Sequence, residues 1–183
     1  AMAFGHVILK EFHVNNPSAY FTDYVRRTTD MPMLVMLEEQ NGVLTTGRFL
    51  RAADLVNNLG EDNNPDWKTI AINKDGRLTS PNGAIGYRWG QAGKWNLEQK
   101  DKDGELELQL SLKDNRDELV DVGFPYFGGA PHEYEYFQHT EHADVQMRKI
   151  PAKRVELANG GTALVATVFD LMLAQYGVDN GVN

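Results

Sequence analysis

The chain has 183 residues, a length that fits one domain or one domain with an appendage. Its formal net charge of −8 argues against nucleic acid and acidic lipid surfaces as partners. With no cysteine, the chain can form no disulfide, no thiolate zinc site and no cysteine-ligated iron–sulfur cluster. No apolar run reaches the ~18–20 residues that a membrane-spanning helix needs.

Residues 1–31 predict a helical hairpin. Apolar residues recur at helical spacing between Met2 and Phe12, and a polar turn then interrupts the pattern. Asn16 as the cap and Pro17 at the first helical position predict a second helix from Pro17 to about Arg27. Its buried stripe is expected to comprise Tyr20, Phe21, Tyr24 and Val25.

A β-hairpin and a short helix are predicted next. Met33–Leu37 is an apolar run of strand length, and Asn41-Gly42 is typical of a type I′ turn leading into Val43–Thr46. Apolar residues at helical spacing then predict a helix over Phe49–Leu59, closed by Gly60.

The middle of the chain predicts further hairpins. Lys68–Asn73 and Arg77–Thr79 flank an Asp75-Gly76 turn. Lys94–Gln99 and Glu105–Leu112 flank a further turn at Asp101–Gly104, and leucine alternates with polar residues in the second arm. This period of two predicts an antiparallel sheet that is covered on one face.

The last third predicts two strands and a final helix. Ala143–Ile150 and Ala152–Leu157 are the strand candidates, separated by Pro151. Thr162 is expected to cap a helix that ends at Gly177. The expected stripe of this helix comprises Val165, Val168, Phe169 and Met172. The predicted fold class is therefore α+β, an antiparallel β meander flanked by terminal helices.

A histidine-rich stretch invites a metal-site interpretation. It contains His132, Glu133, Glu135, His139, Glu141 and His142. Imidazole and carboxylate groups are metal ligands, and a metal-dependent hydrolase is one hypothesis for such a set. No second histidine follows His132 by four positions, so the spacing favours a solvated polar loop.

Other catalytic signatures are missing from the sequence. There is no glycine-rich phosphate-binding motif and no G-x-S-x-G elbow. Ser18, Ser80 and Ser111 suit a helix start, a turn and a strand face, and the pairs Glu38-Glu39 and Asp117-Glu118 suit surface charge. We therefore assign no catalytic, cofactor-binding or metal-binding residue.

Aromatic residues in the sheet and loop regions allow two interpretations. The set is Trp67, Trp89, Trp95, Phe124, Tyr126 and Phe127. Core packing at the ends of a sheet is the first interpretation, and anchoring at an interface in a larger assembly is the second.

Several blocks in register resemble the alpha (catalytic) subunits of respiratory, membrane-bound nitrate reductases, which are molybdopterin oxidoreductases. They are Phe21–Arg27, Thr29–Glu39, Gly47–Val56, Lys94–Gln99, Val122–Gly129 and Thr162–Val165. The resemblance runs in order from about Ala3 to Asn183, and residues 130–142 depart from it. It implies an internal fragment, with residues 1–31 shared with the wider family and 32–183 forming a nitrate-reductase-specific module with a C-terminal helix.

The resemblance also implies properties of the parent enzyme. Such enzymes carry a molybdenum bis-guanine-dinucleotide and a 4Fe-4S cluster, and they couple quinol oxidation to the reduction of nitrate to nitrite. The ligands of both groups lie upstream in the family, so we expect no cofactor in this fragment and no activity from it alone. Implied partners are the remainder of the alpha subunit, the iron–sulfur beta subunit and, through the parent, the membrane cytochrome b subunit. The implied location is cytoplasmic, at the inner face of the cell membrane; a docking module for the beta subunit is the alternative role.

Overall fold

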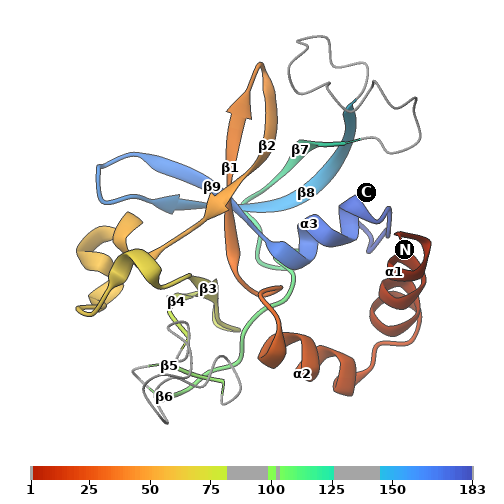
Figure 1. The fold of residues 1–183 in the computed structure, drawn as a ribbon, viewed down its shortest axis with the longest axis horizontal. Helices are drawn as coiled ribbons and strands as arrows, with labels where there is room; N and C mark the ends of the chain where they lie inside the picture. Colours follow the sequence, from red (N-terminus) through yellow and green to blue (C-terminus); the bar gives the residue numbers. More distant parts are fainter. Residues whose placement is uncertain (1, 82–98, 102–103, 126–144, 183) are drawn as a thin grey trace.

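The centre of the molecule is a closed five-stranded β-barrel (Figure 1). The structure is a computed structural model and describes residues 2–81, 99–101, 104–125 and 145–182. The barrel strands are β1 (Leu34–Gln40), β2 (Val43–Phe49), β7 (Glu118–Pro125), β8 (Val145–Glu156) and β9 (Thr162–Thr167). The α+β class is confirmed, since helices accompany this barrel at both ends of the chain.

The barrel closes through one parallel pair, which makes the predicted antiparallel meander only partly right. β2 runs parallel to β7, with Leu44 opposite Val122, whereas the other four pairings are antiparallel. The first strand also pairs with the last, with Leu34 opposite Thr167. Closure removes the open edges of the sheet and turns one face inward.

The turn between β1 and β2 confirms the predicted type I′ hairpin. Gln40 pairs with Val43, and the two residues between them have positive φ, 53° at Asn41 and 81° at Gly42. Asparagine and glycine tolerate this left-handed backbone better than other residues do.

The second strand of the final hairpin was predicted as a helix, and this prediction is wrong. Thr162 does not cap a helix; it begins β9, which pairs with β1 on one side and β8 on the other. The β-branched residues of this stretch suit a strand with two neighbours. The helix α3 (Val168–Gln175) begins only after Thr167, whose hydroxyl oxygen accepts a hydrogen bond from the Asp170 N–H.

The end of α3 confirms the predicted role of Gly177. Its φ is 66°, and its N–H donates to the carbonyl of Ala174 at 2.9 Å. The Val178 N–H donates to the carbonyl of Leu173 at 2.8 Å, and the Val178 side chain is buried. These bonds form a Schellman motif, which satisfies carbonyl groups at the helix end.

Pro151 does not divide two strands as predicted, because β8 runs through it without interruption. Pro151 lies close to the point along β8 where its pairing partner changes from β7 to β9. Pairing with β7 reaches Ala152, and pairing with β9 begins at Lys153.

Residues 49–60 do not form the predicted helix. Phe49 ends β2, and two short 3₁₀ helices follow, Ala52–Asp54 and Val56–Gly60. The second contains positive φ values at Asn57 and at the two residues after it, which an α-helix cannot accommodate. Asparagine favours such local backbone conformations over a regular helix.

The first predicted hairpin of the middle region is confirmed. A second hairpin forms about the predicted turn at Asp101–Gly104, but its predicted first arm lies outside the described residues except for Gln99. β3 (Ala71–Ile72) pairs with β4 (Leu78–Thr79), and β5 (Lys100–Asp101) pairs with β6 (Gly104–Glu105). The alternation that follows is visible in burial, since Leu108, Leu110 and Leu112 are all buried. This segment does not belong to the barrel; within the described parts of the chain, an isolated bridge pairs Leu108 with Asn73.

The first helices pack beside the end of α3. α1 (Met2–Leu9) continues through a π-helical turn (Lys10–Asn15), and α2 (Ala19–Thr28) follows. Ser18, not Asn16, caps α2, because its hydroxyl accepts from the Phe21 N–H at 3.3 Å. The buried residues of this contact are Leu9, Val25, Leu110, Phe169, Leu173 and Val178.

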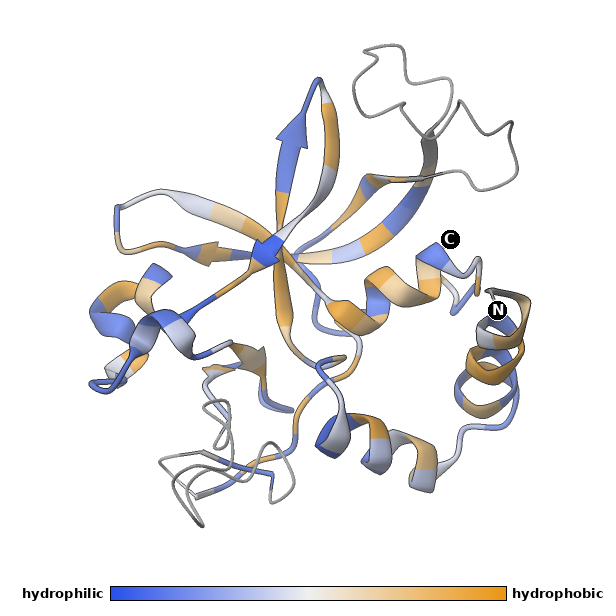
Figure 2. Ribbon diagram, in the orientation of Figure 1, coloured by the Kyte–Doolittle hydropathy of each residue, from blue (hydrophilic) through white to orange (hydrophobic). Residues whose placement is uncertain are grey.

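The predicted buried stripe of α2 is wrong at two of its four positions. Val25 is buried and Phe21 is partly buried, but Tyr20 and Tyr24 are exposed. Figure 2 shows that hydrophobic residues occur along the barrel strands, on α3 and around α1. The helices therefore use one side for the core of this chain and leave apolar side chains on another.

Candidate functional site: uncovered aromatic surfaces

Metal ligands do not gather in the described parts of the chain. Residues 2–81, 99–101, 104–125 and 145–182 hold no group of three histidine, aspartate or glutamate side chains that could bind an ion. The histidine-rich stretch lies outside these residues, namely His132, Glu133, Glu135, His139, Glu141 and His142.

Asp170 is the most perturbed acid in the described structure, and its role is structural. Its Oδ2 accepts hydrogen bonds from the Leu112 N–H at 2.8 Å and from the Thr167 hydroxyl at 3.0 Å. Burial raises the pKa of Asp170 to about 6, although polar groups of Ser111, Leu112 and Thr167 partly oppose the shift. Its Oδ1 makes no hydrogen bond of ordinary geometry within the described residues. The carboxyl group ties the segment before β7 to the start of α3 and is closed to a substrate.

His13 also serves packing. Its ring meets Phe169 edge to face, with ring centroids 4.6 Å apart. Burial lowers the pKa of His13, and the nearby charge of Lys113 lowers it further. A neutral imidazole is therefore favoured against α3, where it joins the first helices to the rest of the chain.

Ser18, Ser111 and Glu118, which were considered above, have ordinary structural roles. Ser18 caps α2, and Ser111 accepts a hydrogen bond from the Lys113 N–H. Glu118 forms an ion pair with Arg154 at 2.7 Å, which links β7 to β8 on the surface. These contacts supply neither a nucleophile with a base nor an acid with a base.

One apolar hollow lies beside α3. It has a volume of about 550 Å³, and residues of β1, β2, β7 and α3 line it, including Thr45, Phe124, Leu171 and Met172. The described residues of the lining include no carboxylate, histidine or lysine, so they offer an apolar contact surface.

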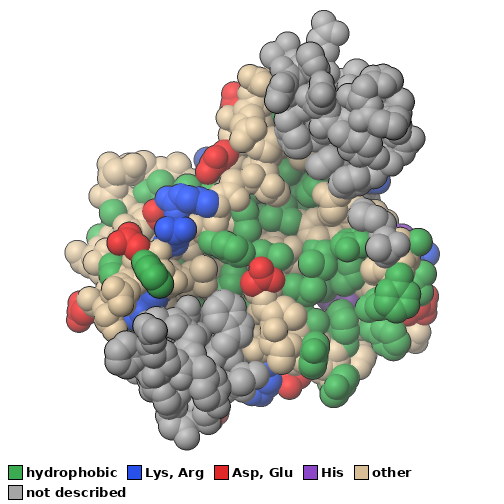
Figure 3. Space-filling model, in the orientation of Figure 1, with side chains coloured by type: hydrophobic (Ala, Val, Ile, Leu, Met, Phe, Trp, Pro, Cys, Tyr) green, Lys and Arg blue, Asp and Glu red, His purple; other side chains and the backbone are tan. Residues whose placement is uncertain are grey.

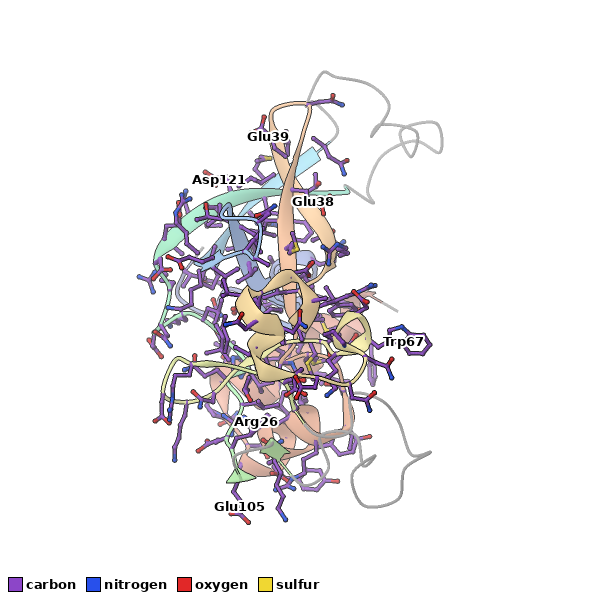
Figure 4. The ribbon with its side chains drawn as sticks, turned by 90° about the vertical axis from the view of Figure 1, so that its left-hand side faces the viewer. Arg26, Glu38, Glu39, Trp67, Glu105 and Asp121 are labelled. Carbon is purple, nitrogen blue, oxygen red and sulfur yellow. The ribbon has the colours of Figure 1, made fainter. Side chains whose placement is uncertain are left out.

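The loop after β2 presents an exposed tryptophan. Both terminal nitrogens of Arg48 donate to the Asp54 carboxylate, at 2.7 and 2.6 Å. This contact holds the pKa of Asp54 below its ordinary value, and Lys68 pairs with Glu61 in the same region. Trp67 is 74% exposed on the 3₁₀ helix Pro65–Trp67, and it projects away from the ribbon in Figure 4.

A second uncovered surface lies on the first helices. Five large side chains define what we call the outer helical face: Phe4 at 72% exposure, Val7 at 54%, Phe12 at 50%, Tyr20 at 80% and Tyr24 at 53%. Figure 3 shows hydrophobic side chains gathered over the region of α1 and α2. Exposed apolar side chains that gather on one surface often mark a contact, so the outer helical face is a candidate interface.

The aromatic residues singled out from the sequence thus divide. Phe124 is buried, in agreement with core packing, whereas Trp67 is exposed, in agreement with an interface anchor. Trp89, Trp95, Tyr126 and Phe127 lie outside the described residues. The outer helical face was not foreseen, although residues 2–12 are apolar on more than one side, which is a sign of burial all round.

No helix in the described parts of the chain is long and apolar enough to cross a membrane. No protein-family model matches the sequence.

Comparison with curated proteins places the whole chain within much longer relatives. It is 60% identical to the respiratory nitrate reductase 1 alpha chain of Escherichia coli and 39% identical to the nitrate reductase alpha chain of Bacillus subtilis. Both matches cover 100% of this chain but only 15% and 14% of those relatives. A respiratory nitrate reductase alpha subunit of Haloferax mediterranei is 30% identical over 51% of the chain. The resemblance seen in the sequence is confirmed: along its whole length, the chain is homologous to a segment of the respiratory nitrate reductase alpha chains.

Proposed function

We propose that this chain is an internal, non-catalytic segment of the catalytic (alpha) subunit of a respiratory nitrate reductase. The observation that carries the proposal is the 60% identity over the full chain, which covers only 15% of the relative. The parent would reduce nitrate to nitrite at molybdenum with electrons from quinol, and this segment would support the subunit that does so. Residues 1–31 would form the part shared with the wider family, and residues 32–183 the nitrate-reductase-specific module.

The residues of this chain do not fit the cofactors that the parent family implies. An iron–sulfur cluster needs thiolate ligands, and the chain has no cysteine. Among the described residues, the buried acid Asp170 already accepts hydrogen bonds from Leu112 and Thr167. We therefore propose that both cofactors of the parent are held by residues outside this chain.

A segment exchange tests the proposal. The matched segment of the Escherichia coli nitrate reductase 1 alpha chain would be replaced by this chain. We expect the chimeric alpha subunit to assemble into the enzyme and to reduce nitrate. An alpha chain from which the segment has been deleted should not assemble. The isolated chain should contain neither molybdenum nor iron and should not reduce nitrate. Stoichiometric metal in the purified chain, or a full-segment chimera that never assembles, would overturn the proposal.

Trp67 favours a second role, docking on the iron–sulfur beta subunit. A largely exposed tryptophan on a loop held by the Arg48–Asp54 ion pair resembles the rigid aromatic anchors of protein interfaces. Trp67→Ala in the alpha subunit should then weaken binding of the beta subunit by roughly tenfold or more. Unchanged binding of the beta subunit would rule out the docking role of Trp67 and would leave the proposed structural role of the segment unaffected.

The remaining assignments concern the parent complex. We propose that the membrane cytochrome b subunit is reached only through the parent, and that the complex lies on the cytoplasmic side of the cell membrane. The relatives support a complex with several subunits, because their names designate alpha chains of respiratory enzymes.

A further inference from the structure

The outer helical face is the least explained surface of the molecule. Its residues lie in two pairs, Phe4 with Val7 and Tyr20 with Tyr24, at the spacings that place side chains on one side of a helix. The Tyr20 and Tyr24 rings lie 6.2 Å apart. Phe12 joins the two helices, because its ring stacks on Phe21 with centroids 6.4 Å apart.

The opposite side of the same helices is already used. Leu9 and Val25 are buried against Phe169 and Leu173 of α3. His6 adds a hydrogen bond from its Nδ1–H to the Tyr176 carbonyl at 2.8 Å. The helices are therefore fixed on this chain, and their outer side chains are held outward in a defined arrangement.

The chemistry of the face points to an apolar occupant. Asp23 lies on α2 with Tyr20 and Tyr24, but its carboxylate is paired with Arg27 at 2.8 Å. Glu11 accepts a hydrogen bond from Asn15 at 2.9 Å. With these two carboxylates engaged, the exposed rings and Val7 offer an apolar, aromatic contact surface.

The comparisons indicate where such an occupant lies. The match to the Escherichia coli relative includes α1 and α2 yet covers only 15% of that polypeptide. Most of the relative is thus available to cover these helices. A contact within one polypeptide also pays no cost for lost translational freedom, so it forms at any concentration.

We infer that the outer helical face packs against a part of the same alpha polypeptide that lies outside this segment, through an apolar contact that buries Phe4, Val7, Phe12, Tyr20 and Tyr24. This inference rests on the proposed function. It goes further by naming the surface of the segment that holds it in the parent.

The test compares two double variants in the chimera described above, prepared without other subunits. Val7→Ser with Tyr24→Ser disrupts the face, and Val56→Ser with Met147→Ser is the matched control at similarly exposed positions elsewhere. We expect the first pair to raise the rate of limited proteolysis roughly tenfold. The reason is that serine hydroxyl groups would replace apolar side chains that the inferred contact buries. The control pair should leave the rate within about twofold. In the isolated 183-residue chain, both pairs should leave the melting temperature nearly unchanged.

A cross-linking experiment identifies the occupant. A benzophenone amino acid in place of Tyr24 should cross-link to peptides of the same alpha polypeptide outside the segment, at a yield well above that from position 56. Cross-links to a second copy or to another subunit would overturn the inference, as would a yield no higher than the control. Failure of the unaltered chimera to assemble would overturn the proposed function and this inference with it.

Discussion

The barrel and the first two helices bury their apolar residues to different degrees. The barrel encloses residues such as Val122, Ile150 and Ala166 with its own strands and α3. The helices α1 and α2 bury Leu9 and Val25 but leave large side chains outward. The barrel buries its core within this chain, whereas the first two helices expose a surface that we infer is buried by another part of the parent. Substitutions in the barrel should therefore destabilise the isolated chain more than substitutions on the outer helical face.

The largest loss is expected in the barrel. Ile150 is fully buried on β8, so Ile150→Ala leaves a cavity that the closed sheet cannot easily fill. We expect the free energy of unfolding to fall by roughly 2–5 kcal/mol, measured by urea denaturation of the isolated chain. Val7→Ala is the exposed aliphatic control. A loss from Ile150→Ala no greater than that of the control would contradict a self-sufficient barrel.

Asp170 should make the barrel side of the molecule sensitive to pH. Its pKa is raised from 3.8 to about 6 in the folded chain, so the folded state holds the proton more tightly than the unfolded state does. The stabilisation from this group is complete below pH 3.8 and is lost as the pH rises through about 6. Relative to Asp170→Asn, the native chain should lose roughly 3 kcal/mol of unfolding free energy between pH 3 and pH 7. A pH-independent difference between the two proteins would show that the carboxyl group is not perturbed.

A smaller effect is expected in the loop that carries Trp67. Asp54 accepts from the Arg51 N–H at 2.9 Å and pairs with Arg48, so Asp54→Ala removes a cap and an ion pair together. We expect a loss of about 1 kcal/mol and faster amide hydrogen exchange across residues 50–68. Asp66→Ala, at an exposed position in the same loop, is the control and should change neither.

The smallest effect is expected on the outer helical face. Tyr20→Ser and Tyr24→Ser should each change the unfolding free energy of the isolated chain by less than about 0.5 kcal/mol. The reason is that both side chains remain exposed in this chain. Losses comparable to that of Ile150→Ala would mean that the helices already bury these rings, and the contrast between the two regions would disappear.

Turns were predictable from the sequence because local backbone chemistry decides them. Asn41-Gly42, Gly76 and Gly177 all sit at positive-φ positions that few other residues tolerate. The strands β7 and β9 were missed because partners distant in sequence decide them. Residues 162–172 carry apolar side chains at helical spacing, yet pairing with β1 and β8 extends the first part of this stretch.

The candidate surfaces were harder to predict than the fold. Helical periodicity identified α1 and α2, but a helix with apolar residues on two sides does not reveal which side faces the core of its own chain. Tyr20 and Tyr24 were therefore predicted to be buried against the core of this chain. Likewise, Trp67 could be named as an aromatic candidate, whereas its exposure depends on how the 3₁₀ turns after β2 direct the loop.

The pairing of β1 with β9 has a consequence for synthesis on the ribosome. Leu34 and its neighbours emerge well before their partner around Thr167, which lies more than a hundred positions further along the chain. Until then, apolar side chains of the β1–β2 hairpin remain exposed, because the barrel that buries them has not yet formed. Barrel closure must therefore wait for nearly the whole segment, and such long-range pairing slows folding. A nascent chain that pauses before β9 would be a natural client for chaperones that shield exposed strands.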